Sequence, residues 1–169
     1  MTHQRSESLP HHDESAAMVP ASPDRVFALI DDHERLVSHM SKSSWRTGGG
    51  HMTTSVDEGL GQRVGSHIRM SGRLLGIELS LDEVVTQRDP PTRKVWETVG
   101  SPRLLVIASY RMGFEAASHG GDTRLTVFID YALPATWPAR WLARLFGRYY
   151  AHWCTRRMVN DAVREFDAS

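Results

Sequence analysis

The C-terminal stretch TWPARWLARLFGRYYAHWCTRRMVNDAVREFD, residues 136–167, decides the fold of this chain. Thr136 can cap the N-terminus of a helix, and Pro138 then falls in the first turn, where its missing N–H leaves no hydrogen bond unmade. No proline follows in the sequence. The stretch therefore predicts a single helix from Thr136 to about Asp167, roughly 45 Å long at 1.5 Å per residue. A helix of that length needs a long partner surface.

Large apolar residues form a wide stripe along this helix, and the arginines fall largely off the stripe. The stripe consists of Trp141, Leu142, Leu145, Phe146, Tyr149, Trp153, Val159, Val163 and Phe166. Residues 137–157 contain five arginines and no acid. This composition favours a solvated basic face, and a face for a membrane surface or an anionic partner is the alternative. Gly147 is the expected point of a bend or of close approach.

The N-terminal part of the chain predicts a polar tail, one strand and two short helices. Residues 1–13 are almost entirely polar, so we expect a disordered tail and a folded domain that spans residues 14–169. A short strand, Ser15–Val19, precedes Ser22-Pro23-Asp24, which is a strong helix start. A second short helix is expected from His33 to about Met40.

The middle of the chain predicts six more strands, separated by turns rich in glycine and proline. The expected strands span residues 51–56, 62–74, 77–85, 93–99, 104–117 and 124–133. Val84-Val85 interrupts the alternation of the third, as a β-bulge does. Successive hairpins favour an antiparallel sheet with one covered face. We therefore predict an α+β fold, in which a curved antiparallel sheet of about seven strands wraps on the long C-terminal helix.

The composition excludes several classes of function. Twenty basic residues balance twenty acidic ones in this chain of 169 residues, so nothing indicates nucleic-acid binding. Cys154 is the only cysteine, which rules out a disulfide framework and a thiolate metal cluster. Gly59, Gly61 and Gly65 lack the spacing of a dinucleotide fingerprint. We expect no metal and no cofactor. No apolar run is long enough to span a membrane or to form a signal-peptide core, so we expect a cytoplasmic protein.

Four short motifs, in this order, make the chain resemble the START-like superfamily, the helix-grip fold of polyketide cyclases/dehydrases and lipid-transfer proteins. They are ASPDRVF at 21–27, RVG at 63–65, VVTQRDPP at 84–91 leading into Val95-Trp96-Glu97, and GDTRLT at 121–126. The resemblance covers roughly residues 14–167. It implies a cavity between sheet and helix for a small hydrophobic molecule, such as a lipid, sterol or polyketide. The superfamily shares no universal catalytic residues, so the resemblance implies a pocket and no particular reaction.

Alternation along the strands gives the residues that we expect to face this cavity. Those from the sheet are Met70, Leu79, Tyr110, Met112, Val127, Ile129 and Tyr131, and those from the helix are Trp141, Leu145, Tyr149 and Trp153. Tyr and Trp combine a large apolar surface with one polar tip, and Met adapts its shape. These walls suit an apolar ligand with a polar end.

No catalytic residue is assigned, and His152 and Tyr110 are the candidates. The other polar residues considered are Glu97, His67, Arg111 and Asp130, of which the last two are expected on the outer face. No carboxylate lies three or four residues from His152 to orient its ring. The sequence therefore favours a carrier or sensor of a small hydrophobic molecule. The first alternative is a cyclase- or dehydratase-type enzyme. The second is a module that docks on a membrane or a protein through the basic aromatic helix. The sequence does not indicate the ligand or the oligomeric state.

Overall fold

The computed structural model of the chain describes residues 8–32, 51–74, 77–135 and 139–168. The elements follow in the order β1 (His11–Val19), α1 (Pro23–Asp31), β2 (His51–Val56), β3 (His67–Leu74), β4 (Ile77–Asp89), β5 (Arg93–Arg103), β6 (Tyr110–His119), β7 (Asp122–Tyr131) and α3 (Ala139–Asp167). Most of the predicted tail, the second short helix and the predicted start of the C-terminal helix lie outside the described residues.

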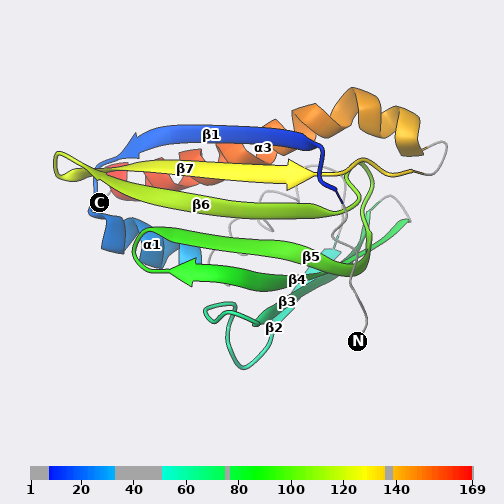
Figure 1. Cartoon of the computed structure of the whole chain (residues 1–169), viewed down its shortest axis with the longest axis horizontal. Helices are drawn as coiled ribbons and strands as arrows, with labels where there is room; N and C mark the ends of the chain where they lie inside the picture. The colour runs from blue at the N-terminus through cyan, green and yellow to red at the C-terminus, as the bar shows by residue number, and fades with distance from the viewer. Residues whose placement is uncertain (1–7, 33–50, 75–76, 136–138, 169) are drawn as a thin grey trace.

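The seven strands form one antiparallel sheet in the order β1-β7-β6-β5-β4-β3-β2. Strands β2 to β7 are a run of hairpins, and β1 pairs with β7, so that Ser15 lies opposite Val127. Helix α3 runs along β1 and β7, and its first turns extend past the ends of these strands (Figure 1). This arrangement is a helix-grip fold, and it confirms the predicted fold class.

Several strand boundaries differ from those that the sequence predicts, and the starts of β1 and β6 bear on the site. β1 begins at His11, so His11–Asp13 belong to the sheet. They pair with Ile129–Tyr131, and this pairing satisfies the backbone of three polar residues that have little to bury. β6 begins at Tyr110 and not at Leu104. β4 is irregular, as the sequence predicts, but its register with β5 shifts between Val85 and Gln87 and not at Val84-Val85.

The first half of α3 approaches the sheet through small residues. Ala143, Gly147 and Ala151 are buried and recur every fourth residue along one side of the helix. A Cβ atom on Gly147 would lie 2.8 Å from Cδ2 of Leu133 and 3.3 Å from the carbonyl oxygen of Val106. Glycine therefore permits the close approach, as the sequence predicted. The large apolar residues of this half do not make the contact.

We call the end of the sheet that α1 and the second half of α3 cover the closed end. Its core contains side chains with no exposed surface, among them Val19, Phe114, Leu125 and Val127. Phe27 of α1 packs on Phe114 with ring centroids 5.2 Å apart. The guanidinium of Arg25 lies 5.0 Å from the ring centroid of Phe166 and joins α1 to α3. Each fully buried side chain of this size contributes about 1.5–3 kcal/mol, so this end supplies most of the hydrophobic stabilisation.

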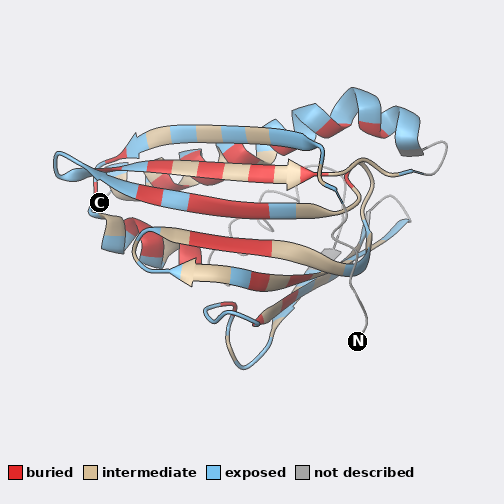
Figure 2. Cartoon of the chain, in the orientation of Figure 1, coloured by how far each residue is buried: buried red, intermediate tan, exposed pale blue. Residues whose placement is uncertain are grey.

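We call the opposite end of the sheet, beside the first half of α3, the open end. Several of its inward-facing side chains keep accessible surface: Val56, Met70, Leu81, Thr98 and Tyr110. Among the described elements, α3 packs on β1 and β7, and no helix packs extensively on β2–β5. The first turns of α3 are mostly exposed, whereas much of β6 and β7 is buried (Figure 2). These side chains of the inner face are thus only half-buried at this end.

No helix in the described part of the chain has the length and apolar character needed to cross a membrane.

Candidate functional site

Glu83 is a carboxyl group on the inner face of the sheet, where the closed end meets the open end. The alternation of β4 places it on the same face as Leu79 and Leu81. Only 2% of its surface is exposed, and its neighbours across the sheet are Ile68 on β3 and Thr98 on β5. A buried carboxyl group must find hydrogen-bond partners or give up its charge.

Side chains from two other strands hold the Glu83 carboxyl. Tyr110 on β6 donates its hydroxyl hydrogen to Oε1 of Glu83, and Trp96 on β5 also hydrogen-bonds to the carboxyl. Burial raises the pKa of Glu83 to about 7, because it outweighs these two hydrogen bonds, which lower it. Burial and the nearby Glu83 raise the pKa of Tyr110 well above its ordinary value. Near neutral pH, Glu83 therefore changes readily between its charged and protonated forms while Tyr110 stays neutral.

Helix α3 places Tyr150 and Cys154 beside this pair. The Tyr150 hydroxyl hydrogen-bonds to the Cys154 thiol, and Tyr150 keeps 42% of its surface exposed. Burial raises the pKa of the thiol to about 11, so Cys154 is not a thiolate nucleophile at neutral pH. The nearby Cys154 and, next, burial raise the pKa of Tyr150. The Glu83–Tyr110 pair thus lies near a tyrosine that keeps exposed surface.

A second polar cluster, formed by Asp31, Arg88 and Lys94, lies on the α1 side of Trp96. Lys94 Nζ lies 2.6 Å from Asp31 Oδ1, and Arg88 Nη2 lies 2.7 Å from Asp31 Oδ2. Burial tends to raise the pKa of Asp31, but the hydrogen bonds from Arg88 and Lys94 bring it below its usual value. Burial lowers the pKa of Lys94. Lys94 has no exposed surface, and its ammonium lies 5.9 Å from the ring centroid of Trp96. The cluster therefore ties α1 to the sheet and helps to position Trp96.

The sheet residues predicted to face a cavity divide between the two ends. Met70, Leu79 and Tyr110 are half-buried at the open end. Met112, Val127 and Ile129 belong to the solid core, with exposed fractions of 8%, 0% and 3%. Tyr131, which is 3% exposed, lies opposite Tyr110 and is buried beneath the first half of α3. The alternation assigns all seven to the inner face, but the cover over the sheet differs from one end to the other.

The four helix residues of the predicted set are all exposed. The exposed fractions are 62% for Trp141, 56% for Leu145, 71% for Tyr149 and 41% for Trp153. Trp153 stacks on Tyr150 with ring centroids 6.1 Å apart. The other three lie away from Ala143 and Gly147, the small residues that contact the sheet.

His152 has a carboxylate partner from the other end of the chain. Its Nδ1 lies 3.2 Å from Oδ1 of Asp13 on β1, and Thr155 donates to the same oxygen at 3.0 Å. Spacing along the helix could not reveal this partner, because Asp13 lies 139 residues earlier. The imidazole is half exposed at the junction of β1 and α3 and is not part of the group around Glu83.

The remaining polar candidates form hydrogen-bonded pairs on the outer face. Glu97 pairs with Arg111 at 3.3 Å, His67 with Asp82 at 2.9 Å, and Asp130 with His12 at 2.7 Å. The outward position of Arg111 and Asp130 agrees with the predicted alternation. In the described part of the chain, no three His, Cys, Asp or Glu side chains gather closely enough to hold a metal ion.

Glu83, Trp96 and Tyr150 are site residues that the sequence analysis missed. The alternation through Leu79 and Leu81 points position 83 inward, and this was the available signal. Interpreting Val84-Val85 as the interruption hides that signal, because Glu83 and Val85 are both buried and the register with β5 shifts only after Val85. For Trp96 no such signal exists, since β5 is buried at three successive positions, Lys94–Trp96.

Comparison with known proteins agrees with this architecture. Among the solved structures with the same fold, Mll3558 from Rhizobium loti is 21% identical, with a TM-score of 0.61 over 90% of this chain and 96% of that one. TTHA0849 from Thermus thermophilus is 15% identical, with a TM-score of 0.61 over 92% of this chain and 95% of that one. Norcoclaurine synthase from Thalictrum flavum, in complex with dopamine and hydroxybenzaldehyde, is 13% identical, with a TM-score of 0.62 over 92% of this chain and 84% of that one. A comparison with curated proteins gives no match. The sequence profile that does match extends over residues 11–162, and the chain therefore belongs to the polyketide cyclase/dehydrase and lipid transport family.

Proposed function

We propose that the chain binds a small, largely apolar molecule with one polar end, between the inner face of the open end and the Tyr150 side of α3. Membership in a family described by polyketide cyclases, dehydrases and lipid transport supports a hydrophobic ligand. Norcoclaurine synthase, which shares the fold, is in complex with two small aromatic molecules. The observation that carries the proposal is the Glu83–Tyr110 pair, which is buried near Met70 and Leu81, two apolar inner-face residues that keep accessible surface.

This pair suits the polar end of a ligand because it offers both hydrogen-bonding roles. The charged carboxylate accepts a hydrogen bond from a ligand hydroxyl, and the protonated carboxyl donates one to a ligand carbonyl. A pKa of about 7 makes both forms available near neutral pH. Met70 and Leu81 supply apolar surface, and each ligand CH₂ group that they cover contributes about 0.8 kcal/mol.

A displacement assay tests the proposal. The neutral dye N-phenyl-1-naphthylamine is added to the purified chain, and 1-naphthol and naphthalene then compete for the site. We expect the dye to brighten, and 1-naphthol to displace it about fivefold better than naphthalene, which corresponds to about 1 kcal/mol for one hydrogen bond. The Glu83→Leu variant should lose this preference and keep its affinity for naphthalene.

Glu97→Leu is the matched control, because Glu97 lies on the neighbouring strand and faces outward. It should behave as the parent does. A parent protein that takes up no dye would contradict ligand binding at the open end. A preference for 1-naphthol that survives in Glu83→Leu would instead show that another group anchors the polar end.

A second candidate function is acid–base catalysis at the same place, since a carboxyl with a pKa near 7 suits proton transfer near neutral pH. Glu83 would take a proton from the carbon next to a ligand carbonyl and return it. In D₂O this exchange replaces hydrogen by deuterium in 2-tetralone, which NMR detects. Catalysed exchange that disappears in Glu83→Gln supports an enzyme, and exchange no faster than in buffer contradicts it.

A further inference from the structure

A second surface, remote from Glu83, lies on the first half of α3. Trp141, Leu145 and Tyr149 are spaced by four residues and form one row. Leu145 and Tyr149 each lie two residues from Gly147, which places them about 200° around the helix from the contact with the sheet. All three are more than half exposed. Leu142 and Phe146, which are 45% and 51% exposed, extend the surface. A contiguous apolar patch of this kind marks an interaction site.

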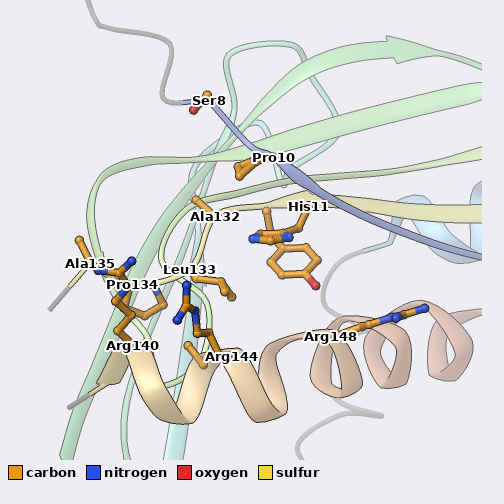
Figure 3. Close-up of a pocket in the computed structure, with 12 residues that line it drawn as sticks. Ser8, Pro10, His11, Ala132, Leu133, Pro134, Ala135, Arg140, Arg144 and Arg148 are labelled. Carbon is orange, nitrogen blue, oxygen red and sulfur yellow. The ribbon is translucent and has the colours of Figure 1, made fainter. Parts of the chain in front are cut away.

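A row of three arginines runs beside the apolar row, one residue earlier at each step. Arg140, Arg144 and Arg148 line a groove of about 650 Å³ between α3, the end of β7 and the start of β1. Arg140 and Arg144 lie beside Leu133 and Pro134, and Arg148 lies further along the helix (Figure 3). The groove therefore combines an apolar floor with a basic wall.

These arginines have no acidic partner among the residues that the structure describes. No acid occurs in residues 137–157, and the neighbouring Asp13 is engaged by His152 and Thr155. Later in the same helix the pattern changes, since Arg157 pairs with Asp161 at 3.5 Å. The first half of α3 thus carries uncompensated positive charge next to exposed aromatic rings.

We propose that this surface, defined by Arg140, Arg144, Arg148, Trp141, Leu145 and Tyr149, docks on an anionic lipid bilayer. Trp and Tyr are suited to the interface between lipid headgroups and acyl chains, and arginines pair with lipid phosphates. A second copy of the chain fits poorly, because the same stretch of the second copy contains no acid that could pair with the arginines. The helix would lie in the plane of the interface.

This docking does not depend on the ligand site, but the docking surface lies next to that site on α3. Tyr150, which faces Glu83, directly follows Tyr149 of the docking surface. A docked molecule would therefore present its open end close to the bilayer.

Sedimentation of the full chain with vesicles tests the proposal. Vesicles of phosphatidylcholine alone are compared with vesicles in which about one third of the lipid is phosphatidylglycerol. We expect binding to the anionic vesicles at low ionic strength that weakens towards ~0.15 M salt, and no binding to the neutral ones. Changing Arg140, Arg144 and Arg148 together to Gln should weaken binding on the order of 100-fold, since each arginine contributes roughly fivefold.

The matched control changes three exposed arginines elsewhere, Arg63, Arg103 and Arg124, to Gln and removes the same charge. It should keep the affinity of the parent. Leu145→Gln should weaken binding without altering the circular dichroism melt. Absence of sedimentation with anionic vesicles, or equal losses in the two triple variants, would overturn the proposal. So would a dimer, seen by analytical ultracentrifugation without vesicles, that Leu145→Gln dissociates.

Discussion

The closed and the open end of the sheet are built from the same strands, with the same alternation, and differ in what covers them. At the closed end α1 and the second half of α3 exclude water from Phe114 and Val127. At the open end Met70 and Leu81 face inward in the same way but keep accessible surface. Alternation thus decides which face a side chain occupies, and the packing of the helices decides whether that face is a core or a site.

Helix α3 shows the same division along its length. Met158, Val159 and Ala162 are buried in its second half, whereas the buried residues of the first half are the small Ala143, Gly147 and Ala151. Close approach of the backbone at Gly147 leaves no room for large side chains, so these project elsewhere. The large apolar side chains in the first half of α3 are therefore exposed to solvent.

The largest expected effect concerns Glu83, at the boundary between the two ends. Its pKa rises from 4.5 to about 7 in the folded protein. The folded state binds this proton more tightly, so the stability it contributes is complete below pH 4.5 and is lost as the pH rises through 7. The difference corresponds to about 3 kcal/mol. Relative to the parent, Glu83→Gln should therefore gain about 3 kcal/mol of unfolding free energy between ~pH 4.5 and ~pH 8.

Urea melts of both proteins across this range measure that gain, because groups common to the two proteins cancel in the difference. Glu97→Gln, which changes the outward-facing carboxyl paired with Arg111, should show no comparable trend. If the free energy of unfolding changed with pH equally in the parent and in Glu83→Gln, Glu83 would ionise as it does in the unfolded chain. Glu83 would then not be a buried carboxyl at the boundary between the two ends.

Sequence patterns were sufficient for the fold because each element carries its own local signal. Ser22-Pro23 starts α1, alternation gives the strands, and Gly147 gives the close approach. The site depends on contacts that no local pattern contains. Asp13 meets His152 across 139 residues, and Glu83, Trp96 and Tyr110 come from three different strands. The apolar stripe of α3 misled for a related reason: amphipathicity identifies a stripe and not the partner that it contacts.

An intermediate effect compares the same substitution at the two ends. Val127 has no exposed surface, whereas Val56 on β2 is half-buried and faces inward opposite Ile68. Val127→Phe should destabilise the protein by about 1–3 kcal/mol, because its neighbours must leave their preferred rotamers. Val56→Phe should cost less than about 1 kcal/mol, since the ring can extend into accessible space. Equal losses in urea melts would show that the open end is as tightly packed as the closed one.

The smallest expected effect tests the division within α3. Leu145 is 56% exposed and Met158 is 7% exposed, and both are unbranched at Cβ and lie inside the same helix. Leu145→Gln should change the free energy of unfolding by less than about 0.5 kcal/mol, because glutamine is a good helix former and little apolar contact is lost. Met158→Gln places an amide in the core and should cost about 1–3 kcal/mol. Thermal and urea melts of the isolated chain, without lipid, compare the two variants at equal protein concentration. A loss in Leu145→Gln as large as that in Met158→Gln would mean that the first half of α3 is covered in solution, and its exposed surface would then not be free to dock.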